Sequence, residues 1–285
     1  MLSKELREEI AKIIIKDYEG VKTKSDLEKT VASQQLLYGR HVDLVLQELG
    51  QKVEGKNILD VGCGFGGTVL ELCELHAKAY GLDVDKVKVK IANQIAKAKN
   101  IENTFVVSSG ESIPFRNNFF DVTFSIYVLE HTSNPYKVLL EKVRVLKPNG
   151  LLYIRTVNYA SPKTAKREPH YLFFLPTMPK FLAKIYVSLR GRNPTFIKNI
   201  NFLTPRVIRN TLRNHVTSYR DLGEERIIGR IQNPERIALN HPVARKILMI
   251  LKRIKLSFVA CEIVRSIPIY TTTIRIIAKK KEPIP

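Results

Sequence analysis

The sequence predicts an α/β fold in which the strands of a mostly parallel sheet alternate with helices. Three observations support this prediction. An apolar run from Val53 to Leu59 leads through Asp60 into a glycine-rich loop. Short apolar or β-branched runs then alternate with segments of helical periodicity as far as Val157. The chain has 285 residues, 44% of them hydrophobic, and this is enough for one large domain with its own core.

The expected elements follow one another in the order that such a sheet requires. Residues 1–52 are expected to form an N-terminal helical cap, with helices at Lys4–Lys16 and, with interruptions, near Ser25–Leu49. Tyr270–Lys280 alternates in polarity and is rich in β-branched residues, so it predicts a last strand. The strands and helices between these ends are expected at Val53–Leu59, Thr68–Leu75, Ala77–Asp83, Lys86–Lys99, Thr104–Val107, Phe119–Ser125 and Leu151–Val157.

The glycine-rich loop after the first strand is suited to a nucleoside ligand. Gly62, Gly64 and Gly66 remove the side chains that would keep a ligand off the backbone, and glycine allows positive φ angles. With Gly67 the same letters also satisfy the G-x-G-x-x-G pattern of dinucleotide-binding loops. The carboxylate of Asp60 would repel a pyrophosphate and attract a sulfonium or ammonium. The loop therefore favours S-adenosylmethionine, and a turn that only packs a helix on a strand is the remaining alternative.

The second expected strand ends in another carboxylate. Asp83 lies 21 residues beyond Gly62, near the separation at which such folds bind ribose hydroxyls. A carboxylate accepts hydrogen bonds from both hydroxyls at once, so Asp83 is the candidate for the ribose. Asp85 is a spare candidate, and its main expected role is to cap the helix that follows.

Residues 55–157 resemble the class I S-adenosylmethionine-dependent methyltransferases, because five segments of this stretch occur in the same order as the motifs of that family. The chain is similar to the branch of that family that methylates quinone precursors and other small or lipid-like acceptors. The resemblance implies a Rossmann-like sheet of seven strands, mostly parallel, with an antiparallel last strand. It implies one methyltransferase domain over residues 53–285, in which residues 158–269 contain helical insertions on the acceptor side after the fifth strand.

The resemblance also implies S-adenosylmethionine as the cofactor and indicates where it binds. The glycines are expected to line its methionine and ribose, and the loop after the third strand to lie on its adenine. The family usually has an aspartate where this chain has Ser109, whose hydroxyl accepts one hydrogen bond without help from a charge. Lower donor affinity, or a larger contribution from backbone near Gly110, would follow. The expected cofactor-binding residues are Asp60, Gly62, Cys63, Gly64, Gly66, Asp83, Val84, Ser109, Gly110, Glu111 and Ile126.

The sequence contains no residue that must act as a catalytic acid or base. The loop Ile126–Pro135 must face the reaction site, because ligands bind beyond the carboxyl ends of parallel strands. His131 in this loop is a candidate general base, and the alternative is that it bonds a neighbouring backbone group. His170, in the aromatic run after the fifth strand, is a second candidate. Methyl transfer needs little acid or base help, since a sulfonium is reactive and alignment supplies much of the rate.

Charge divides the chain unevenly. Residues 1–150 contain 21 Lys and Arg against 20 Asp and Glu, whereas residues 151–285 contain 26 against 7. The half expected to choose the acceptor is therefore strongly basic, and this favours an anionic partner. Val243–Val259 is expected to form a basic amphipathic helix with two open interpretations. It lies in an anionic membrane surface, or it docks its apolar side on the sheet. Arg40, before the first strand, is a candidate partner for the donor's carboxylate or an ordinary solvated residue.

Two other functions compete with methyl transfer to a small or lipid-like acceptor. An RNA methyltransferase would also be basic, but the aromatic residues lie in apolar runs such as 171–174 rather than among basic ones. A non-catalytic S-adenosylmethionine-binding subunit is supported by Ser109 alone. Cys63, Cys73 and Cys261 have neither metal nor disulfide spacing, so no metal is expected. The absence of a long apolar run predicts a cytoplasmic protein, or one held peripherally on the cytosolic face of a membrane.

Overall fold

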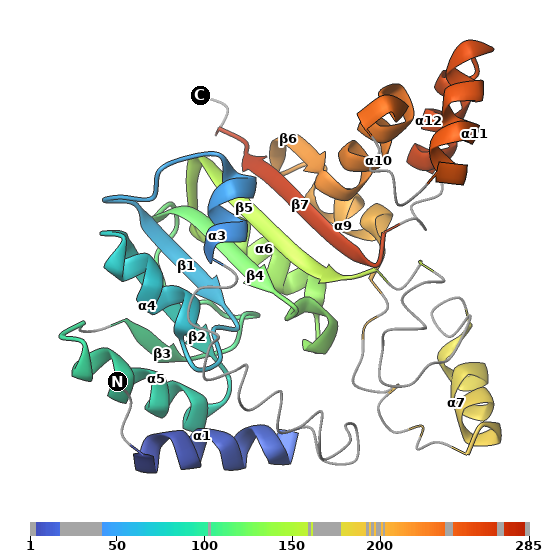
Figure 1. The fold of residues 1–285 in the computed structure, drawn as a ribbon. Coiled ribbons are helices and arrows are strands. Elements are labelled where there is room, and N and C mark those ends of the chain that lie inside the picture. Colours follow the sequence, from blue (N-terminus) through green and yellow to red (C-terminus); the bar gives the residue numbers. More distant parts are fainter. Residues whose placement is uncertain are drawn as a thin grey trace.

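The computed structural model describes residues 4–17, 42–101, 104–158, 161, 178–191, 194, 197, 201, 203–236, 242–266 and 271–282. Within them a seven-stranded sheet has the order β3-β2-β1-β4-β5-β7-β6 (Figure 1). Neighbouring strands from β3 to β5 pair in parallel, and β7 pairs antiparallel with both β5 and β6. This confirms the predicted α/β class, the mostly parallel sheet and the antiparallel last strand.

The described residues form seven strands, and the candidate site is expected at the carboxyl ends of the parallel strands. The first begins at Asn57 rather than at Val53, because Gly55 takes a φ of 69° and the Lys56 amide donates to the Val53 carbonyl at 3.0 Å, closing a turn. It also continues through Asp60, which therefore lies inside a strand. The bounds are β1 Asn57–Val61, β2 Lys78–Asp83, β3 Phe105–Val107, β4 Phe120–Ile126, β5 Leu146–Val157, β6 Val216–Asp221 and β7 Thr273–Lys280.

Two further strand predictions need correction. β5 begins at Leu146, before the predicted Leu151, because Leu146 pairs with Phe120 across a register shift. The sheet has the seven strands that the resemblance implied, but β6 was not located in the sequence and lies in a region expected to hold helical insertions. Its sequence is largely polar and its side chains are mostly exposed or half-buried, since it forms the edge of the sheet. An edge strand of this kind lacks the apolar alternation that identifies strands in a sequence.

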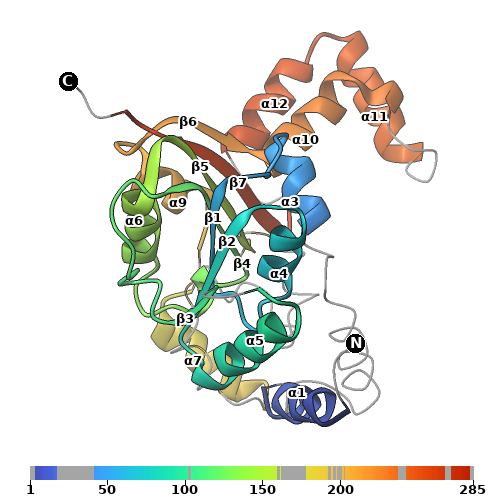
Figure 2. The ribbon, with the colours of Figure 1, turned by 90° about the vertical axis from the view of Figure 1, so that its left-hand side faces the viewer.

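Helices cover both faces of the sheet (Figure 2). One core joins the sheet to α1, α3, α4 and α5, and the other joins it to α6 and α9. One predicted helix start is confirmed, since Asp85 caps α5. Thr204 caps α9 in the same way. The helices are α1 Lys4–Asp17, α3 Val42–Leu49, α4 Gly67–Glu74, α5 Lys86–Ala98, α6 Pro135–Val145, α7 Lys180–Leu189, α9 Pro205–Leu212, α10 Leu222–Gln232, α11 Pro242–Arg253 and α12 Ser257–Ser266, with short 3-10 helices η1 Leu129–His131 and η4 Pro234–Arg236.

The helices α10, α11 and α12 project beyond the β6–β7 side of the sheet (Figures 1 and 2). They form their own small core around Ile231, Cys261 and Val264. The prediction of one helix over Val243–Val259 is wrong, because the chain turns after α11, with Lys255 at a φ of 58°. The candidates Arg40 and His170 lie outside the described residues, as does most of the predicted helix before α3.

Candidate functional site

The glycine-rich loop joins β1 to α4 in a left-handed backbone conformation. Gly62, Gly64 and Gly66 have φ angles of 82°, 55° and 79°, which other residues rarely adopt. A Cβ atom on Gly62 would lie 2.3 Å from Val128, and one on Gly66 would lie 2.4 Å from Phe105. Around Gly64, no atom of the described residues other than its chain neighbours lies within 4 Å of the corresponding position. Gly62 and Gly66 thus allow close packing inside the protein, and Gly64 has the space for a ligand to approach.

The Asp83 carboxylate lies beside this loop at the tip of β2. Its Oδ2 accepts from the Gly64 amide at 2.9 Å, and its Oδ1 accepts from the Asp85 amide at 3.0 Å. Each oxygen keeps a further lone pair for a ligand hydroxyl. Val84, the next residue, is 68% exposed and offers an apolar surface at the same edge. The Asp85 side chain accepts from the Val87 amide at 2.9 Å and caps α5, as predicted.

Two buried titratable side chains, Asp60 and Lys142, lie beneath the loop. Asp60 is 6% exposed, and Lys142 of α6 is fully buried. Burial raises the pKa of Asp60 to about 8, an effect that Lys142 opposes and Asp83 reinforces. Burial also lowers the pKa of Lys142 to about 7, against the attraction of Asp60. The Lys142 ammonium donates to Ser125 Oγ at 2.6 Å and to the Tyr153 carbonyl at 3.3 Å. A cationic ligand beside Asp60 would therefore favour its ionised form.

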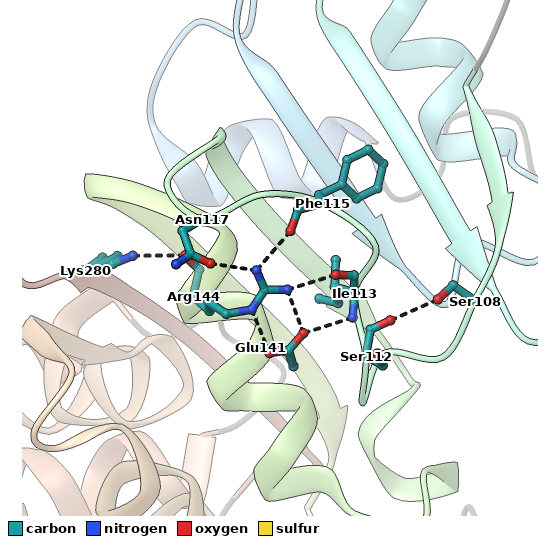
Figure 3. A network of polar contacts seen from close by, with 8 residues as sticks. All are labelled: Ser108, Ser112, Ile113, Phe115, Asn117, Glu141, Arg144 and Lys280. Atoms are coloured by element: carbon teal, nitrogen blue, oxygen red, sulfur yellow. Dashed lines mark hydrogen bonds and ion pairs between the residues drawn. The ribbon is translucent and has the colours of Figure 1, made fainter.

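The loop after β3 is held from one side by α6 (Figure 3). The Arg144 guanidinium donates to the carbonyl oxygens of Ile113 at 2.8 Å and Phe115 at 2.9 Å. It also donates to Asn117 and pairs with Glu141, both at 2.7 Å. The Glu141 carboxylate in turn accepts from the Ile113 amide at 2.9 Å. This network fixes the loop that the sequence predicts to lie on adenine.

The residues expected around adenine already make contacts within the protein. Ser109 Oγ accepts from the Glu111 amide at 3.1 Å and keeps one lone pair. Glu111 Oε1 accepts from the Asn134 amide at 2.8 Å, just before α6. A Cβ atom on Gly110 would lie 2.9 Å from Val61, so the backbone here packs closely on β1. These contacts make Glu111 a structural residue of the loop and leave Ser109 and the Gly110 backbone for a ligand.

The loop after β4 places an acid and a histidine in different surroundings. Glu130 is buried, and its Oε2 accepts from Thr156 Oγ1 at 2.7 Å. Burial raises the pKa of Glu130 and lowers that of His131. The His131 side chain is only partly shielded from solvent, and it forms no hydrogen bond within the described part of the chain. The alternative in which its ring bonds a neighbouring backbone group is therefore not observed there.

The remaining predicted cofactor-binding residues are Cys63 and Ile126. Burial holds the pKa of the Cys63 thiol well above its usual range, and the side chain packs where Gly81 leaves room. Ile126 is half-buried at the end of β4. The described residues contain no group of three or more His, Cys, Asp or Glu side chains that could hold a metal ion.

Sequence reasoning missed Tyr127 and Arg155. Tyr127 follows β4 at a φ of 57°, and its amide donates to the Arg155 carbonyl at 2.8 Å. The Arg155 guanidinium lies over the Tyr127 ring, 5.4 Å from its centroid. A charged residue within the otherwise apolar run of a central strand was the available signal, because such a residue seldom enters a sheet without a specific partner.

Comparisons with known proteins agree with the fold. Residues 59–154 match a family model described as "Methyltransferase domain". Over 120 residues the chain is 30% identical to the sterol 4-C-methyltransferase strm-1 of Caenorhabditis elegans, covering 41% of this chain and 36% of the relative. Over 110 residues it is 34% identical to the ubiquinone biosynthesis O-methyltransferase of Maricaulis maris, covering 38% of this chain and 43% of the relative. The chain thus spans less than half the length of these curated relatives.

One solved structure illustrates how far the likeness in fold extends. The crystal structure of the YcgJ protein from Bacillus subtilis aligns with a TM-score of 0.51 at 19% identity. The alignment covers 85% of this chain and 98% of that one. At this level of identity the likeness establishes the fold alone.

Proposed function

We propose that this chain transfers a methyl group from S-adenosylmethionine to a small or lipid-like acceptor, because residues 59–154 match a family model described as "Methyltransferase domain". The observation that carries the proposal is the junction of Gly64 and Asp83. The backbone at Gly64 is open to a ligand, and the Gly64 amide donates a hydrogen bond of 2.9 Å to the Asp83 carboxylate and so helps to position it. Relatives named for sterol and ubiquinone-pathway methylation support an acceptor of this class.

The proposed donor site uses residues from three elements. Asp83 would accept hydrogen bonds from the ribose hydroxyls, and Ser109 with the Gly110 backbone would contact adenine. Asp60 would lie nearest the positive charge of the donor, where its ionised form is stabilised. Gly62, Cys63, Gly66, Val84, Glu111 and Ile126 would complete the surroundings. The bound donor supplies an electrophilic methyl group, and the protein aligns it with the acceptor.

His131 is the proposed base on the acceptor side. Its ring is exposed, and desolvation lowers its pKa, so it is mostly neutral and able to accept a proton at neutral pH. His170, outside the described residues, stays a predicted second candidate.

We further propose that the enzyme works against an anionic membrane surface. The apolar side chains along α11, the turn after it and the start of α12 are exposed rather than docked on the sheet: Ile247 is 53% exposed, Ile250 51%, Ile254 53% and Phe258 70%. Exposed basic residues lie among these positions, namely Lys246, Lys252, Arg253 and Lys255. Apolar area combined with basic charge suits the interface of an anionic bilayer. Among the described helices none is long and apolar enough to cross a membrane.

The test of the activity is a transfer assay with labelled S-adenosylmethionine and three separated extracts: lipids, small polar metabolites and RNA. We expect label in the lipid or small-molecule extract. Label in RNA alone would support the competing function that the basic half of the chain suggests. Donor binding without label in any extract would support a non-catalytic binding subunit.

A further inference from the structure

Arg155 lies at the edge of the sheet where ligands are expected. It aligns with Ile126, the last residue of β4, and ligands bind beyond the carboxyl ends of parallel strands. Phe124 aligns with both Asp60 and Tyr153, so these three side chains share one face of the sheet. Arg155 is two residues beyond Tyr153 and shares that face. Two strand spacings, about 10 Å in total, separate β5 from β1 and its glycine loop.

The charges around Arg155 leave it without a counter-ion. Its cross-strand neighbour is Arg275, which donates to Glu48 Oε1 at 2.6 Å. The other oxygen of Glu48 accepts from the Tyr153 hydroxyl at 2.6 Å. The two arginines therefore have one carboxylate near them, and its oxygens are already engaged by Arg275 and by the Tyr153 hydroxyl. In the described chain no carboxylate forms an ion pair with Arg155.

Hydrogen bonding around Arg155 is incomplete as well. Its Nε is buried and has no hydrogen-bond partner among the described residues. A buried donor without a partner is uncommon and calls for a physical explanation. The guanidinium lies over Tyr127, which is 39% exposed and is held at a φ of 57°, in the left-handed region that residues other than glycine seldom adopt. An unpaired buried donor and a strained neighbour at a ligand-binding edge are both typical of functional sites.

From these observations we infer that Arg155 and Tyr127 form a binding site for a carboxylate or phosphate group. A guanidinium presents paired N–H donors that match the oxygens of such a group. The aromatic ring against its face limits the orientations that it can take. The inference rests on the proposed function for the source of the anion, which is either the α-carboxylate of the donor or an acidic group of the acceptor.

The test separates these two sources with probes of known structure. S-adenosylhomocysteine carries the amino-acid carboxylate, and 5′-methylthioadenosine is a related nucleoside without it. Both are titrated by calorimetry into the wild type and Arg155→Gln. If the site binds the donor, the variant loses about tenfold or more in affinity for S-adenosylhomocysteine and none for 5′-methylthioadenosine. If it binds the acceptor, both nucleosides bind unchanged, and binding of inorganic phosphate and 4-hydroxybenzoate, followed by NMR, falls about tenfold or more.

The matched control is Arg209→Gln. Arg209 also lies over a tyrosine ring, 4.8 Å from the centroid of Tyr219, but it is paired with Glu224 at 3.3 Å. This control should leave the binding of every probe unchanged. Arg155→Lys keeps the charge without the paired donors, so it should recover part of the binding and replaces the glutamine variant if that one does not fold.

Unchanged binding of all four probes in folded Arg155→Gln would overturn the inference. If the wild type bound neither nucleoside, the proposed function would fail, and the phosphate and hydroxybenzoate titrations would still decide whether Arg155 binds an anion. The two failures are therefore distinguishable.

Discussion

At the scale of single residues, the electrostatics of the proposed donor site depend on how deeply its charges are buried. Asp60 shares the core with Lys142, and burial raises the pKa of the acid to about 8 while it lowers that of the base to about 7. Asp83 accepts two backbone hydrogen bonds at the rim. The two carboxylates expected near one ligand therefore respond differently to pH.

We expect the affinity for S-adenosylmethionine to rise as the pH increases from about 6 to about 8. The pKa of Asp60 lies near 8 in the free protein, and a bound sulfonium favours the ionised carboxylate, so binding releases a proton below that pH. Calorimetry at several pH values measures this slope. Asp60→Asn should flatten it, and an equal slope in the variant would assign the dependence to another group, such as the donor's own ammonium.

His131→Ala should lower turnover by about a hundredfold or more if the imidazole removes a proton from the acceptor. Donor affinity measured in parallel should stay the same, because His131 is proposed to face the acceptor. His215→Ala is the matched control, since this histidine lies in the turn before β6. A loss below about tenfold would favour a mechanism in which alignment of donor and acceptor suffices.

At the scale of elements, α6 is the part of the fold that holds the site together. Arg144 and Glu141 fix the loop after β3, and Lys142 reaches beneath β4 and β5. The N-cap of α6, Asn134, also donates its amide to Glu111. One helix thus positions the expected adenine loop and the buried base below it.

Arg144→Met should destabilise the fold by about 1 to 3 kcal/mol, because it leaves two carbonyl groups and Glu141 without their donor. Urea denaturation measures the change. Arg220→Met is a suitable comparison, since Arg220 pairs with Glu225 on an exposed surface and its loss should cost about 0 to 1 kcal/mol. Equal losses in the free energy of unfolding for both substitutions would show that the Arg144 network stabilises the fold no more than an exposed ion pair does.

The elements also show what a sequence can and cannot predict here. β2, β4 and β7 lie within a few residues of their predicted bounds, because buried apolar runs identify them. β6 was missed because an edge strand needs no apolar face. The break after Arg253 was missed because α11 and the turn continue the same amphipathic pattern. The contact of Tyr127 with Arg155 joins residues far apart in sequence, and no local pattern encodes it.

At the scale of the whole molecule, charge and shape point to different tasks for the two halves. The first 150 residues are nearly neutral, and the basic excess lies in the rest. Part of that excess lies on α11, in the unit of three helices that projects from the sheet (Figure 2). A projecting basic and apolar unit is suited to contact a surface larger than a small molecule.

Ile250→Ser combined with Ile254→Ser should weaken co-sedimentation with vesicles containing phosphatidylglycerol. These side chains are more than half exposed, so the substitutions remove apolar area without disturbing the core. Leu140→Ser is the control and should have no effect, since the Leu140 side chain of α6 is 40% exposed and lies outside the unit of α10, α11 and α12. Binding to RNA would instead depend on Lys252 and Arg253 and ignore the isoleucines. Tight RNA binding without vesicle binding would contradict the membrane proposal.

The most direct test of the central claim is a calorimetric titration of S-adenosylhomocysteine into the wild type, Asp83→Ala and Asp121→Ala. Asp121 serves as the control because it pairs with Lys147 near the opposite end of β4. We expect the wild type to bind S-adenosylhomocysteine without competition from nicotinamide dinucleotides. We also expect a loss of about 1.5 to 3 kcal/mol in Asp83→Ala, the range for hydrogen bonds to a charged acceptor, and no loss in Asp121→Ala. Unchanged affinity in Asp83→Ala would contradict the ribose assignment, and a wild type that binds no S-adenosylhomocysteine would contradict the proposed function.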